Sequence, residues 1–178
     1  MVPSPGGVLD RLLEDERIAF EGISAASSGA INATMLACAL AEGGHQEAKR
    51  ALAKLWSRIA HLSSLTTLQP SLVDRLSQNH SLDASPAFML FDLMTRLISP
   101  YQFNPFNYNP LRQVLTETID FEALRSGHCP VKLFLSATNV RTGKIQVFKN
   151  DEIGPDTVLA SACLPLMFQA VEIDCEHY

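Results

Sequence analysis

The sequence lacks any concentration of positive charge. Its 14 Lys and Arg face 19 Asp and Glu, the formal net charge is -5, and no run of basic residues stands out. Nucleic acids are bound mainly through their phosphates, which requires clustered Lys and Arg. We therefore expect no nucleic-acid partner.

Residues that could hold a metal ion or a disulfide framework are few and scattered. No two of the five His have the spacing of a zinc site. The cysteines form no C-x-x-C pair, and three of the four lie in apolar segments; they are Cys38, Cys129, Cys163 and Cys175. This pattern is typical of reduced cysteines in an intracellular protein. We expect no metal, no cofactor and a cytoplasmic location.

Long hydrophobic runs are also missing. The longest apolar stretch, residues 30–41, is interrupted by Asn32 and Thr34, and a membrane-spanning helix needs about 20 apolar residues. Residues 1–7 lack the basic and apolar regions of a signal peptide. We expect any contact with a membrane to be peripheral. The oligomeric state does not follow from the sequence.

The chain does contain an alternation of helix-like and strand-like segments. With 178 residues, 47% of them hydrophobic, it has enough apolar material for one globular domain spanning residues 1–178. Apolar spacing predicts helices over residues 7–14, 29–40, 45–62, 83–98, 111–118 and 156–163, and strands over 18–24, 131–137, 145–148 and 171–173. Gly43 and Gly44 are expected to end the second of these helices. The alternation indicates an α/β layered domain.

The segment most informative about function is GISAASSGAINA, residues 22–33. A strand, a tight turn bearing Ser27 and a helix of small residues form a nucleophile elbow. The start of a helix favours the negative charge that develops on an attacking serine and on the oxyanion. In the usual G-x-S-x-G pattern, Ala25 stands where the first Gly belongs, which adds a methyl group. Locally, a nucleophile and a plain helix cap are equally supported.

Other polar residues have simpler interpretations. Ser24 belongs by register to the strand, and Ser28 belongs to the first helical turn. Ser161 is expected to cap or pack the helix over residues 156–163. Asp174 is expected in the turn of a terminal hairpin, and His177 is interpreted as a solvated residue rather than a general base.

Four segments together resemble the patatin-like phospholipases. They are VLDRLL at residues 8–13, FEGISAASSGAINA at residues 20–33, ATNVRTG at residues 137–143, and ASACLP at residues 160–165 followed by Phe168. They occur in the family's order along nearly the whole chain. The resemblance implies a three-layer α/β/α domain with a mostly parallel sheet. It also implies Ser27 as nucleophile of a Ser–Asp dyad without histidine, no cofactor, and a lipid or fatty-acyl ester substrate.

The sequence departs from the family pattern at both ends. The family's first strand and glycine-rich oxyanion loop would precede Val8, and its dyad Asp, in an Asp-Gly motif, would follow Tyr178. We therefore expect a partial domain in which Ser27 hydrolyses lipid esters weakly or not at all, and which is only marginally stable. The alternative is a non-catalytic remnant that keeps the fold. A Ser-His-Asp hydrolase is disfavoured because the serine comes too early and no partner His can be placed. The apolar residues 88–98 and the aromatic loop 101–108 suit core packing, and the alternative is a lid or an acyl-chain wall.

Overall fold

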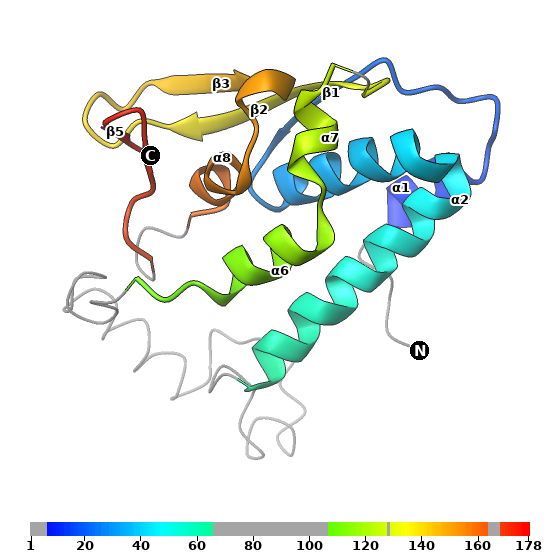
Figure 1. Cartoon of the computed structure of the whole chain (residues 1–178), viewed down its shortest axis with the longest axis horizontal. Helices are drawn as coiled ribbons and strands as arrows, with labels where there is room; N and C mark the ends of the chain where they lie inside the picture. The colour runs from blue at the N-terminus through cyan, green and yellow to red at the C-terminus, as the bar shows by residue number, and fades with distance from the viewer. Residues whose placement is uncertain (1–6, 66–106, 128, 164–167) are drawn as a thin grey trace.

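The computed structural model describes residues 7–65, 107–127, 129–163 and 168–178, except for the side chains of residues 62–65. Figure 1 shows a sheet along one side of the molecule and helices packed beneath it. The helix predicted over residues 83–98 and nearly all of the aromatic loop lie outside the described residues.

The central sheet contains three strands in the order β1-β2-β3. β1 (Gly22–Ala26) runs parallel to β2 (Lys132–Thr138), and β3 (Ile145–Lys149) runs antiparallel to β2. The predicted α/β class is confirmed. The first strand was predicted from residue 18, but it begins at Gly22, because Gly22 is the first residue to face a partner, Lys132.

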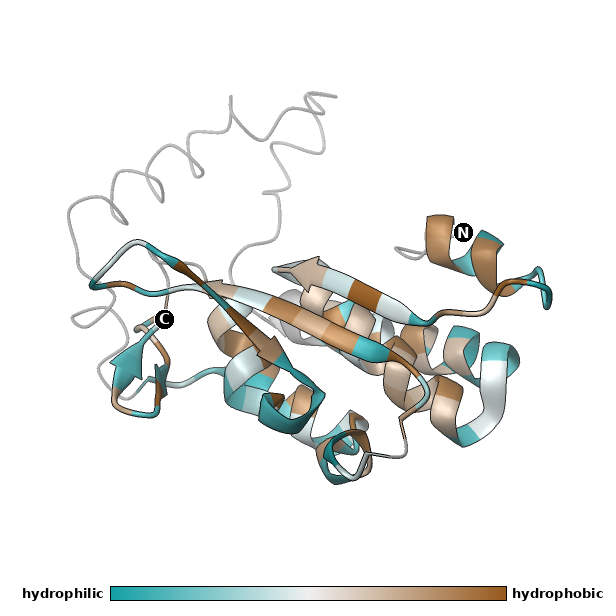
Figure 2. Ribbon diagram, turned by 90° about the horizontal axis from the view of Figure 1, so that it is seen from above, coloured by the Kyte–Doolittle hydropathy of each residue, from teal (hydrophilic) through white to brown (hydrophobic). Residues whose placement is uncertain are grey.

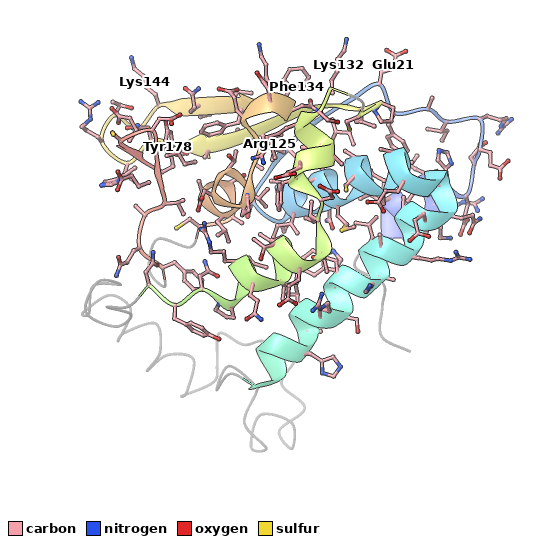
Figure 3. All side chains as sticks on the ribbon, viewed as in Figure 1. Glu21, Arg125, Lys132, Phe134, Lys144 and Tyr178 are labelled. Atoms are coloured by element: carbon pink, nitrogen blue, oxygen red, sulfur yellow. The ribbon has the colours of Figure 1, made fainter. Side chains whose placement is uncertain are left out.

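Burial on β2 alternates with the pleat of the strand. Leu133 and Leu135 are fully buried against the helices, whereas Lys132 and Phe134 lie on the opposite face. Figure 2 shows the apolar stripe along this strand, and Figure 3 shows Lys132 projecting away from the helices. Each buried Leu stabilises the fold by roughly 1.5–3 kcal/mol. The strand is therefore held to the helices by one face only.

Helix α2 (Ser28–Leu65) begins directly after β1 and bends in its middle. Gly44 has φ 69°, a left-handed conformation that a side chain would strain, and a Cβ at Gly43 would come within 2.8 Å of Glu47. The two glycines were predicted to end one helix before the next begins at residue 45, and this is confirmed: Gly43 and Gly44 have non-helical backbone angles, and α2 consists of two helical arms that meet at this kink. The indole N–H of Trp56 donates a 2.6 Å hydrogen bond to Asn32, which joins the two arms.

The remaining helices of the described residues are short. They are α1 (Gly7–Leu13), α6 (Pro110–Thr118), α7 (Phe121–Arg125), the 3₁₀ turn η2 (Asn150–Glu152) and α8 (Pro155–Ser161). Two of them, α6 and α7, begin at a residue whose side chain caps them. Asn109 accepts a hydrogen bond from the N–H of Leu111 at the start of α6, and Asp120 accepts two at the start of α7. The Asp120 cap was the signal that could have predicted α7. α2 and α8 pack on the sheet, and α6 packs on these two helices.

The chain ends in a small hairpin of β4 (Glu172–Ile173) and β5 (Glu176–His177). Asp174 and Cys175 form its two-residue turn with φ 50° and 62°, the left-handed pair that such hairpins require. The expected position of Asp174 in a turn is therefore confirmed. The N–H of Val140 donates to the carbonyl of His177 at 2.8 Å, so the hairpin is attached beside the β2–β3 turn.

Candidate functional site

Ser27 occupies a sharp turn between the end of β1 and the start of α2. Its φ of 54° lies in the left-handed region, and its side chain is exposed. This conformation costs a residue other than glycine about 1–2 kcal/mol. The N–H of Ala30 donates to the Ser27 carbonyl at 2.9 Å, so the helix begins at once. A strained, exposed serine between a strand and a helix has the geometry of a nucleophile elbow.

Ala25 fits into this elbow in place of the usual glycine. It lies within β1, and its φ is not positive, so the backbone does not require glycine there. A Cβ placed on Gly29 would lie 3.7 Å from the Cβ of Ala25, which is an ordinary contact distance. The added methyl group therefore does not crowd Gly29 across the turn.

Ser161, at the end of α8, contacts the elbow directly. The backbone N–H of Ser27 donates to its Oγ at 3.0 Å, and the same hydroxyl donates to the Ser136 carbonyl at 2.7 Å. The expected packing role of Ser161 thus extends to the candidate nucleophile. Sequence reasoning did not foresee this contact, because 134 positions separate the two serines.

A cavity of about 680 Å³ opens beside Ser27. Its walls come from the elbow, the end of β2, the β2–β3 turn, the end of α8 and the terminal hairpin. The lining is mostly apolar and includes Ala26, Ser27, Ala137, Val140, Ile145, Ala160, Ser161, Cys163, Phe168, Ala170 and Tyr178. A pocket of this size and character suits an extended hydrocarbon group next to a hydroxyl.

None of the described side chains lining this cavity is a carboxylate or an imidazole. Its titratable side chains in the described part of the chain are Cys163 and Tyr178, and burial raises the pKa of the Cys163 thiol. The described residues also contain no group of three His, Cys, Asp or Glu that could hold a metal ion. The site is thus a hydroxyl in a largely uncharged environment.

Of the other residues considered from the sequence, Ser24, Ser28 and His177 are outside the lining of this cavity. Ser24 is on β1 and Ser28 is the first residue of α2, as expected. The exposed side chain of His177 lines a second, more polar cavity of about 600 Å³, together with Arg112 and Asp156. This cavity adjoins the one beside Ser27, because Cys163, Phe168 and Ala170 line both. Arg112 and Asp156 form an ion pair there.

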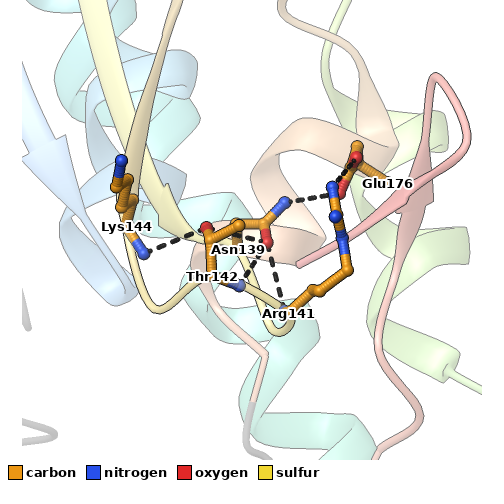
Figure 4. Close-up of polar contacts among 5 residues, drawn as sticks. All are labelled: Asn139, Arg141, Thr142, Lys144 and Glu176. Atoms are coloured by element: carbon orange, nitrogen blue, oxygen red, sulfur yellow. Dashed lines mark hydrogen bonds and ion pairs between the residues drawn. The ribbon is translucent and has the colours of Figure 1, made fainter.

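Asn139 organises the turn that borders the cavity (Figure 4). Its side-chain oxygen accepts hydrogen bonds from the N–H of Arg141 at 3.1 Å and from the N–H of Thr142 at 2.9 Å. Its amide donates to Glu176 at 2.9 Å, and Arg141 also donates to Glu176 at 2.6 Å. Asn139 therefore shapes the turn and joins it to the terminal hairpin.

The elbow at residues 20–33, the turn at residues 137–143 and the end of α8 thus meet around one cavity. The chain matches the family model described as patatin-like phospholipase over residues 3–178. It belongs to the patatin-like phospholipase family. No curated protein and no solved structure matches the chain. The fold is the α/β fold of this patatin-like family, whose members act on lipid substrates.

These patatin-like segments are distant in sequence but adjacent in space. Each contributes one wall of the cavity: the elbow contributes Ser27, the turn contributes Asn139, and α8 contributes Ser161.

No helix in the described part of this patatin-like chain is long and apolar enough to cross a membrane. The four cysteines are free; Cys38 is buried and Cys175 is exposed.

Proposed function

We propose that Ser27 is the nucleophile of a lipid acyl hydrolase. Its hydroxyl would attack the carbonyl carbon of a fatty-acyl ester, the alcohol part would leave with a proton, and water would then release the fatty acid from the acyl-serine. The observation that carries the proposal is the position of Ser27: an exposed hydroxyl on a left-handed elbow that opens onto a mostly apolar cavity.

The start of α2 supplies the electrostatic part of this chemistry. The first N–H groups of a helix have no partners within the helix and carry partial positive charge. The N–H groups of Ser28 and Gly29 stand at this position, directly after Ser27. They are the candidates for stabilising the oxyanion, and removing one such donor from an enzyme typically costs about 100–1000-fold in rate.

We further propose that the 178-residue chain turns over weakly by itself. Serine needs an adjacent base to become a good nucleophile, and the described side chains that line the cavity include no carboxylate or imidazole. The alternative is a non-catalytic remnant that keeps the fold and binds acyl chains in the cavity. The two possibilities differ in whether Ser27 reacts at all.

The test is labelling of the purified chain with a fluorophosphonate, together with hydrolysis of a short p-nitrophenyl ester. Ser27→Ala removes the candidate nucleophile. Ser24→Ala is the matched control, because Ser24 is exposed on β1 and outside the described cavity lining. We expect labelling at Ser27 in the wild type and in Ser24→Ala, none in Ser27→Ala, and slow ester turnover.

Absence of labelling in the folded wild type would favour the non-catalytic alternative. Ser27-dependent turnover at about 1–1000 per second, the ordinary enzyme range, would contradict the proposed weak turnover. Labelling that persists in Ser27→Ala would move the reactive group to another residue.

A further inference from the structure

The hydrogen-bond ladder between β1 and β2 ends one residue before Ser27. Ala26 and Ser136 are its last facing pair. At its other end, the N–H of Lys132 donates to the Glu21 carbonyl at 3.0 Å. In a parallel ladder such a residue also accepts, through its carbonyl, from the N–H two positions further along the partner strand, and the arrangement repeats every second residue. Continued to Ser136, the ladder would bring the Ser27 N–H to the Ser136 carbonyl.

The hydroxyl of Ser161 lies between these two groups. It accepts from the Ser27 N–H at 3.0 Å and donates its own hydrogen to the Ser136 carbonyl at 2.7 Å. A serine hydroxyl has one hydrogen, so donation to Ser136 leaves its lone pairs to face Ser27. One side chain of α8 thus replaces a backbone contact that the strands would otherwise make directly.

The hydroxyl is held in place by the packing of α8. Val158 and Leu159 are buried in the core, and Thr157 anchors the start of the helix by donating to the Glu152 carbonyl at 2.9 Å. The hydroxyl therefore stands on a rigid element while the residue that it contacts has a strained backbone.

We infer that Ser161 is a positioning residue for Ser27. Its hydroxyl fixes the Ser27 backbone N–H against β2 and so maintains the left-handed turn that presents the Ser27 side chain to the cavity. Because this contact uses the Ser27 N–H, the oxyanion donors are the later amides at the start of α2. The inference rests on the proposed role of Ser27, but the contact itself can be measured without any catalytic activity.

The experiment compares Ser161→Ala and Ser161→Thr with wild type. Amide hydrogen exchange of Ser27, followed by NMR on the ¹⁵N-labelled chain, reports the contact, and the rate of fluorophosphonate labelling reports the nucleophile. Asp156→Asn is the matched control, because it weakens the ion pair of α8 with Arg112 without touching the elbow.

We expect Ser161→Ala to accelerate Ser27 amide exchange by about two- to tenfold, the factor that one net hydrogen bond corresponds to. Labelling should slow, while exchange elsewhere in β1 stays unchanged. Ser161→Thr keeps a hydroxyl and should retain both wild-type rates. Asp156→Asn should change neither rate.

Unchanged Ser27 exchange in a natively folded Ser161→Ala chain would overturn the inference. If that variant does not fold, Ser161→Cys takes its place, because a thiol forms only weak hydrogen bonds. Equal Ser27 amide exchange in Ser161→Cys and wild type would then overturn the inference. If the wild type is not labelled, the proposed function fails, and amide exchange still decides the role of Ser161.

Discussion

The side-chain amide of Asn139 donates a 2.9 Å hydrogen bond to the carboxylate of Glu176 and thereby ties the β2–β3 turn to the terminal hairpin. Asn139 is 8% exposed, and its oxygen accepts three further hydrogen bonds, from Arg141 and Thr142. The Asn139 side chain thus provides the acceptor for the backbone N–H groups of the turn and attaches the terminal hairpin to the cavity wall.

Replacing Asn139 should destabilise the fold. Asn139→Ala leaves the Arg141 and Thr142 N–H groups without their acceptor, and we expect a loss of about 1–3 kcal/mol in the free energy of unfolding. Urea denaturation followed by circular dichroism measures it. Arg141→Ala is the control: its side chain is exposed, so losing its ion pair with Glu176 should leave the midpoint nearly unchanged. Equal midpoints for Asn139→Ala and wild type would contradict the assigned role.

The attachment of the hairpin should depend on pH. Hydrogen bonds from Asn139, and then from Arg141, lower the pKa of Glu176 below its ordinary value. A carboxylate with a lowered pKa stabilises the fold above its unfolded pKa, about 4.3, and this stabilisation is lost as the pH falls through the folded value. The melting temperature of the wild type should therefore exceed that of Glu176→Gln at pH 7, and this difference should disappear as the pH falls through the folded pKa of Glu176. A gap that persists unchanged below pH 3 would argue against this linkage.

Replacing Ser27 with glycine should stabilise the chain while removing its reactive group. Glycine adopts φ 54° without the strain that a side chain brings, so Ser27→Gly should gain about 1 kcal/mol in the free energy of unfolding. Ser27→Ala keeps a Cβ and should show no such gain. Thermal melting of both variants isolates the left-handed strain, because both lack the hydroxyl; identical melting temperatures would show that the elbow is unstrained.

Two neighbouring residues of β2 should respond very differently to truncation. Leu135 is fully buried against the helices, so Leu135→Ala should cost about 2–5 kcal/mol. Phe134 is 36% exposed on the other face, and Phe134→Ala should cost under about 1 kcal/mol. Urea midpoints of the two variants compare the faces directly. Similar losses would mean that both faces of the sheet are packed.

The cysteines should differ in their reactivity toward thiol reagents. Burial raises the pKa of the Cys38 thiol to about 11, so little thiolate forms at pH 8 and access is blocked. Cys175 lies exposed in the hairpin turn. Iodoacetamide at pH 8 followed by peptide mass spectrometry should modify Cys175 first and Cys38 only after denaturation. Modification of Cys38 in the folded chain would indicate local opening of α2.

Local chemistry made several features predictable from the sequence. The alternation along β2, the Pro110 start of α6 and the hairpin turn at Asp174 depend on neighbouring residues only. The elbow was predicted for the same reason, since a strand, a turn and a helix of small residues follow one another without a break. The break between the two arms of α2 was predicted from Gly43 and Gly44, but the hydrogen bond from Trp56 to Asn32 that joins the arms was not, because the two residues lie 24 positions apart.

The sequence by itself determined where the candidate nucleophile stands, which residues cap the helices and which family the motifs resemble, because these depend on residues close together in the chain. The tertiary structure decided what each motif contacts. Ser27 meets Ser161, and Asn139 meets Glu176, only after the sheet and α8 have packed. A hydrogen bond forms only when donor and acceptor lie about 3 Å apart in space. The local sequence around either residue does not indicate such a contact when the two residues are far apart in the chain. Packing of the core therefore assembled the site from parts that the sequence had specified separately.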